Sequence, residues 1–101
     1  MWILDTLGRT GIITAGIVIQ RGRVERVEVL VFRERRGQGV QAASFTRQFE
    51  GAALTDRGGL DRRIDGITGA TISVRAVTNL ARLALYLDRR VSDADTAVEK
   101  P

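Results

Sequence analysis

Two segments near the N-terminus have the hydrophobic pattern of β-strands. Residues 12–20 (IITAGIVIQ) are rich in β-branched side chains, and in residues 23–34 (RVERVEVLVFRE) valines occupy positions 27, 29 and 31. Arg21-Gly22 separates the two segments, and glycine supplies the positive φ that a two-residue turn needs. We therefore predict an antiparallel hairpin. Residues 2–6 predict either an edge strand or a short helix, and their pattern does not distinguish the two.

The second half of the chain has helical periodicity. From Ser73, a suitable N-cap, to about Arg90, apolar side chains recur at three- and four-residue spacing. These apolar positions are Val74, Val77, Leu80, Ala81, Ala84, Leu87 and Val91. A short helix is predicted within residues 44–53, with Ser44 as cap and Phe45 and Phe49 on its buried face. The polar, glycine-containing residues 35–39 and 55–63 predict loops.

Together these elements predict an α+β fold, in which a small antiparallel sheet packs against a long C-terminal helix with a short helix beside it. A chain of 101 residues, 44% hydrophobic and 28% charged, suits one folded domain. We expect this domain to span residues 1–91. Residues 92–101 are small and polar and predict a frayed tail.

The composition excludes several kinds of chemistry. The chain has no cysteine and no histidine, so we predict no catalytic residues and no metal site. Its net charge is +4, but the arginines are scattered and aromatic residues make up only 5%, so nucleic-acid binding is not expected. No apolar run reaches the length of a membrane span, and the N-terminus lacks the features of a signal peptide.

The sequence DGITGAT, residues 65–71, directly precedes the predicted helix. Gly66 and Gly69 allow the loop to curl, and the first amides of the helix favour an anion at the same place. Such an anion would lie near the hydroxyls of Thr68 and Thr71. Three arginines are close in sequence: Arg62, Arg63 and Arg75. The alternative is a loop that only caps the helix.

DGITGAT resembles the D-G-x-[ST]-G-A-T signature of the FMN-binding domain family, which includes flavin-carrying components of the sodium-translocating NADH:quinone reductase and of the Rnf electron-transport complex. The resemblance implies FMN as cofactor, joined to Thr71 through a phosphoester by an FAD:protein FMN transferase. It implies further cofactor contacts from the rest of the signature: Asp65, Gly66, Ile67, Thr68, Gly69 and Ala70. Thr68 is the alternative acceptor hydroxyl.

A second, weaker resemblance lies in residues 34–39, ERRGQG, which are similar to the family's E-T-P-G-x-G loop near the flavin. Arginines replace the threonine and proline of that pattern. The resemblance implies cofactor contacts from three residues: Glu34, Arg36 and Gly37. In all it covers residues 12–87, although only the seven-residue signature is highly specific.

The resemblance implies an electron carrier, with no enzymatic activity of its own, that works with redox partner proteins outside the cytoplasm. A threonine hydroxyl is scarcely ionised at neutral pH, so the transferase must activate it. We expect the Asp65 carboxylate to orient the loop by accepting an N–H bond from Ile67 or Thr68; the alternative role is recognition by the transferase. We also expect the protein to be a monomer. Two alternatives stay open: a module that binds or senses FMN without a covalent bond, and a basic module that binds nucleic acid or an acidic protein.

Overall fold

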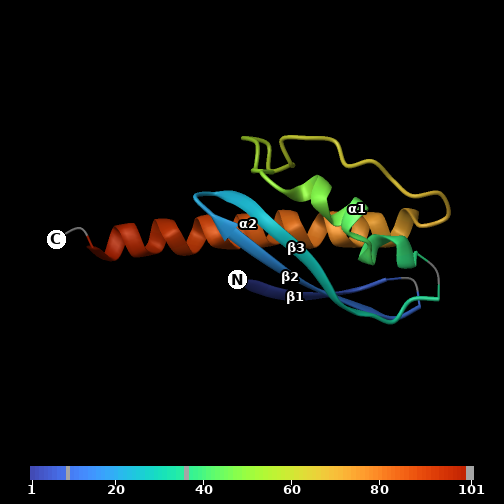
Figure 1. Cartoon of the computed structure of the whole chain (residues 1–101). Coiled ribbons are helices and arrows are strands. Elements are labelled where there is room, and N and C mark those ends of the chain that lie inside the picture. Colours follow the sequence, from blue (N-terminus) through green and yellow to red (C-terminus); the bar gives the residue numbers. More distant parts are fainter. Residues whose placement is uncertain (9, 36, 100–101) are drawn as a thin grey trace.

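The structure is a computed structural model that describes residues 1–8, 10–35 and 37–99, the last seven by their backbone alone. Three strands form one antiparallel sheet in the order β1-β2-β3: β1 (Trp2–Leu7), β2 (Ile12–Gln20) and β3 (Arg23–Phe32). Helix α2 (Thr71–Glu99) crosses one face of this sheet (Figure 1). Three short helical segments connect sheet and helix: η1 (Gln38–Gln41), α1 (Ala43–Thr46) and η2 (Arg47–Phe49). The predicted α+β fold is confirmed.

The predicted hairpin joins β2 and β3. Its turn residues, Arg21 and Gly22, both have positive φ, 56° and 76°, which matches the twist of a two-residue turn between antiparallel strands. Residues 2–6, which the sequence left undecided, belong to the edge strand β1. Its side chains alternate between the core and solvent, so Trp2 and Leu4 pack on the core while Ile3 is exposed.

Strand β3 does not keep a strict alternation. Thr14 pairs with Val31 and Ala15 with Val29, so Leu30 is an extra residue and forms a bulge. The side chain of Leu30 is 49% exposed. Beyond the bulge the strand changes the face it presents, and Phe32 packs on the core. The sequence pattern of valines at every second position therefore predicts the strand but not its register.

The core lies between the sheet and helix α2. Ile13, Ala15 and Ile17 of β2 are fully buried against the helix, and alanines on the helix allow the two layers to approach closely. Phe45 and Phe49 are both buried, with ring centroids 5.6 Å apart in an edge-to-face arrangement. Their predicted place in the core is confirmed.

Both ends of helix α2 differ from the sequence prediction. It begins at Thr71, two residues before Ser73, which is buried in its first turn. It continues to Glu99, past the predicted end near Arg90, because no glycine or proline interrupts residues 71–99. Val91 is 47% exposed, since the helix has by then passed the edge of the sheet (Figure 1). None of the helices in the described part of the chain has the length and apolar content needed to cross a membrane.

The short helix also starts elsewhere than predicted. Ala42, not Ser44, holds the N-cap position of α1, and no side chain caps this helix. The predicted single helix over residues 44–53 is divided between α1 and η2, which together end at Phe49.

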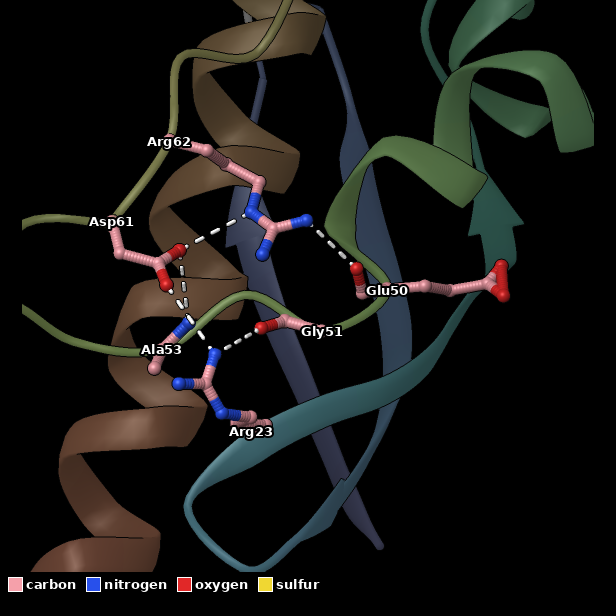
Figure 2. Close-up of polar contacts among 6 residues, drawn as sticks. All are labelled: Arg23, Glu50, Gly51, Ala53, Asp61 and Arg62. Atoms are coloured by element: carbon pink, nitrogen blue, oxygen red, sulfur yellow. Dashed lines mark hydrogen bonds and ion pairs between the residues drawn. The ribbon is translucent and has the colours of Figure 1, made fainter.

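The segment after η2 is attached to the edge of β3. Val24 donates a backbone hydrogen bond to Ala52 O (2.8 Å) and accepts one from Gly51 N (2.7 Å). Arg23 Nη1 donates to Gly51 O (2.8 Å) and forms an ion pair with Asp61 at 3.5 Å (Figure 2). These bonds hold the loop in place before it leads into the DGITGAT segment.

Asp61 lies at the centre of this network. Its Oδ1 atom accepts hydrogen bonds from Ala53 N (3.2 Å) and Arg62 Nε (3.1 Å), and Arg62 Nη1 donates to Glu50 O (2.8 Å) (Figure 2). The hydrogen bond from the Ala53 amide, followed by the charges of Arg62 and Arg23, lowers the pKa of Asp61 below its ordinary value.

We expect Asp61→Asn to destabilise the fold at neutral pH, because it removes the negative charge of this network. The loss should be only roughly 1 kcal/mol, since water partly screens the side chain. The Asp61 carboxyl has a higher pKa in the unfolded chain than in the folded protein, so the unfolded chain takes up the proton first. The wild type should therefore lose this stabilisation as the pH falls below about 4. Urea unfolding of both proteins at about pH 7 and about pH 3 tests this. The stability difference should shrink at the lower pH; an unchanged difference would contradict the role of the charge. Asp56→Asn, in the same loop, is the matched control.

Candidate functional site

The DGITGAT segment forms a tight turn in front of helix α2. Ala70 N donates to Ile67 O (3.0 Å), and Gly69, the third residue of the turn, has φ +79°, which only glycine adopts readily. Val74 N then donates to Ala70 O (2.9 Å), which is the first bond of the helix. The second glycine of the segment is therefore required by the turn. Gly66 has no such requirement, since its φ is not positive and a Cβ there would meet nothing within 4 Å.

The turn places Thr71 at the first position of the helix. The amides of Thr71 and Ile72 precede the first intrahelical donor, so the helix itself offers them no acceptor. A helix of 29 residues also has the positive end of its dipole here. The side chain of Thr71 is exposed at this point. Backbone amides, the dipole and a hydroxyl thus meet in one place that favours an anion.

A cavity of about 540 Å³ opens over this helix end. It is lined by residues from the β1–β2 connection, the segment after β3 and the start of α2: Thr10, Glu34, Arg35, Gly69, Ala70, Thr71, Ile72 and Ser73. Its volume lies in the range of pockets that hold small organic cofactors.

The loop that follows β3 packs directly against the helix start. Gly37 has φ +93°, and a Cβ there would overlap Ser73 Oγ and lie 2.8 Å from Ser73 Cβ and 3.4 Å from Ala70 Cβ. At Gly39 a Cβ would lie 3.0 Å from Ile67 Cδ1. The absence of side chains at Gly37 and Gly39 therefore brings the two sequence-predicted segments into contact.

A buried carboxylate fixes the other side of the cavity. Glu34 is only 9% exposed, and its Oε2 accepts hydrogen bonds from the backbone N (2.6 Å) and the hydroxyl of Thr10. Arg35 N donates to the same hydroxyl (3.3 Å). Thr10 lines the cavity but was not predicted from the sequence, because its partner lies 24 residues away and no motif marks it.

The structure brings together only some of the predicted residues. Four line the cavity: Glu34, Gly69, Ala70 and Thr71. Gly37 and Ile67 pack against the same segments, whereas Asp65, Gly66 and Thr68 are exposed and lie outside the lining. Arg36 lies outside the described residues.

The expected role of the Asp65 carboxylate is wrong. Among the described residues it accepts no bond from the amides of Ile67 or Thr68. Instead the backbone of Asp65 is held by Gln48, which accepts from Asp65 N (2.7 Å) and donates to Asp65 O (3.2 Å). A side-chain amide offers both a donor and an acceptor, so Gln48 replaces the local turn that a short carboxylate was expected to make.

Comparison with known families matches residues 8–86 to the model described as the FMN-binding domain. Comparison with curated proteins and with solved structures gave no significant match. The family match includes β2, β3, all three segments that line the cavity, and α2 up to Tyr86. A cavity beside an anion-binding helix end suits the phosphate of FMN. The chain therefore belongs to the FMN-binding domain family, and FMN is its cofactor.

Proposed function

We propose that this chain is an electron-carrier domain that holds FMN through a phosphoester bond to Thr71. The observation that carries the proposal is the position of Thr71: its side chain is exposed, it begins helix α2, and it lines the cavity. A phosphate esterified to its oxygen would lie at the positive end of the helix, beside amides that have no acceptor within the helix.

The attachment needs a second protein. The Thr71 Oγ1 atom bonds to the FMN phosphorus of FAD, the phosphoanhydride bond breaks, and AMP leaves. The hydroxyl proton passes to a base of the FAD:protein FMN transferase, which also activates the threonine. This chain contributes an accessible hydroxyl on a rigid turn, in agreement with a sequence that contains no histidine and no cysteine.

When bound, FMN supplies the electron-transfer chemistry, and the protein tunes it and sets its exposure. Ala70 is buried, and together with Gly69 and Ile72 it forms a wall close to the attachment point. Glu34 and Thr10 fix the opposite wall. In this proposal the domain spans residues 1–91, and a polar tail follows at 92–101, of which residues 92–99 continue helix α2. The domain acts as a monomer outside the cytoplasm and passes electrons to redox partner proteins without catalysing a reaction of its own.

A second function remains a candidate: binding or sensing of FMN without a covalent bond. The cavity of about 540 Å³ and the helix end favour this non-covalent function. Together they could bind the isoalloxazine ring and the phosphate of FMN without an ester bond.

Co-expression with a transferase separates the two functions. We expect the wild-type protein to stay yellow after acid precipitation, and its intact mass to increase by one esterified FMN. Peptide mapping should place the added mass on the peptide that contains Thr71. A flavin that is lost on denaturation, with an unmodified chain, would favour the non-covalent function.

A further inference from the structure

A second hollow, of about 300 Å³, lies between helix α2 and the loop that precedes the DGITGAT segment. We call it the basic groove, defined by its lining: Leu60, Arg62, Ile64, Val74, Arg75, Thr78, Asn79 and Arg82. Three of these residues are arginines, and none is acidic. The groove therefore concentrates positive charge on one flank of the molecule.

Two of the three arginines lack a compensating charge. Arg62 forms an ion pair with Asp61 at 3.1 Å. Arg82 donates only to neutral acceptors, Gly58 O (3.1 Å) and Asn79 Oδ1 (3.2 Å). Arg75 is exposed, and neither it nor Arg82 has an ion-pair partner in the described part of the chain. The groove thus has two full positive charges to offer to a ligand.

The groove begins next to the flavin site. Thr71, Arg75, Thr78 and Arg82 follow one another at intervals of four, three and four residues, so they lie along one face of helix α2. Arg75 is about 6 Å along the helix axis from Thr71. Anything that lies in the groove therefore reaches the neighbourhood of the FMN attachment point.

The groove combines an apolar floor with polar walls. Leu60 and Ile64 are partly buried against the core, and Val74, which also lines the groove, is buried. Its loop side is held by the bridge between Leu54 and Leu60 and by the bonds around Arg62 (Figure 2). A groove that is already ordered loses little conformational entropy when a partner binds.

We propose that the basic groove docks an acidic segment of a partner protein, with its carboxylates beside Arg75 and Arg82 and an apolar side chain over the Leu60–Ile64 floor. Complementary charge directs the encounter and sets its orientation. Docking itself needs no flavin. The consequence that a docked partner exchanges electrons or delivers the flavin rests on the proposed function.

The test uses a fluorescein-labelled peptide of glutamate and leucine, with binding followed by fluorescence anisotropy. The protein is the Thr71→Ala variant, expressed without a transferase and shown by its absorbance to be free of flavin. We expect the double variant Arg75→Gln/Arg82→Gln to weaken binding about tenfold, as the loss of two exposed charge pairs would. The matched control is Arg26→Gln/Arg89→Gln, which removes the same charge at exposed positions away from the groove. It should change the affinity less than about twofold. Arg75→Gln alone breaks no hydrogen bond of the described structure. It therefore shows whether weaker binding comes from the lost charge or from a loop that loosens when Arg82 is replaced.

Three outcomes would overturn the proposal. Equal weakening by both double variants would show that only total charge matters, and no effect of either would show that the peptide binds elsewhere. Groove-dependent binding of a single-stranded oligonucleotide, with none of the peptide, would assign the groove to nucleic acid. Because the protein carries no flavin, each of these results leaves the role of Thr71 untouched, and loss of the Thr71 proposal leaves the docking result intact.

Discussion

Thr71→Ala is expected to abolish covalent attachment of flavin while the fold stays intact. The substitution removes the exposed hydroxyl at the start of helix α2 that lines the cavity; Ser73, in the same turn and the same lining, is buried. Because the side chain is exposed and alanine favours a helix, the free energy of unfolding should change by less than about 0.5 kcal/mol. Intact-mass measurement after co-expression with a transferase checks the first part, and thermal unfolding of the flavin-free proteins checks the second.

Thr68→Ala is the matched control for this result. Thr68 carries the other hydroxyl of the signature, but it lies in the preceding turn and does not line the cavity. The variant should accept flavin as the wild type does. Modification that survives in Thr71→Ala and disappears in Thr68→Ala would move the attachment point to Thr68.

Gly37→Ala should lower the free energy of unfolding by roughly 2–4 kcal/mol, through a strained backbone and a steric clash together. Residue 37 has φ +93°, and its new Cβ would lie 2.8 Å from Ser73 Cβ. Ser73 is 3% exposed within the first turn of α2, so it has little room to move away. The clash can be relieved only if the loop or the start of the helix moves. Because both lie at the cavity, we also expect a smaller fraction of the protein to carry flavin.

Gly66→Ala is the control for Gly37→Ala. Its φ is not positive and its Cβ would meet nothing within 4 Å, so its stability should stay within about 0.5 kcal/mol of the wild type. Urea unfolding of both variants gives the comparison. Equal stability of the two would contradict the close packing of the Gly37 loop on the helix.

The main elements of the fold follow from local patterns. The Arg21-Gly22 turn between two β-branched segments predicts the hairpin, and three- and four-residue spacing predicts helix α2. The bulge at Leu30 was not predictable, because it depends on how β3 pairs with β2. The helix start at Thr71 was missed because the turn from Ile67 to Ala70 leads the chain into the helix two residues before Ser73.

The site was predictable only in part. The DGITGAT signature identified the helix end and Gly69, which depend on adjacent residues. The contacts of Thr10 with Glu34 and of Gln48 with Asp65 join residues 24 and 17 positions apart, and no sequence pattern marks them. They arise only when the strands and the loops are packed together. The same holds for the basic groove, whose arginines come from the loop and from the helix.

Helix α2 has a practical consequence for attaching this protein to a surface. It runs from Thr71 to Glu99 and passes the edge of the sheet (Figure 1), so its far end lies about 40 Å from Thr71, the proposed attachment point of the flavin. A tether at that end would hold the protein on an electrode with the cofactor facing away from the electrode surface and toward the solution. Direct electron transfer between the electrode and the cofactor requires a tether near the β1–β2 connection instead, since Thr10 lines the cavity.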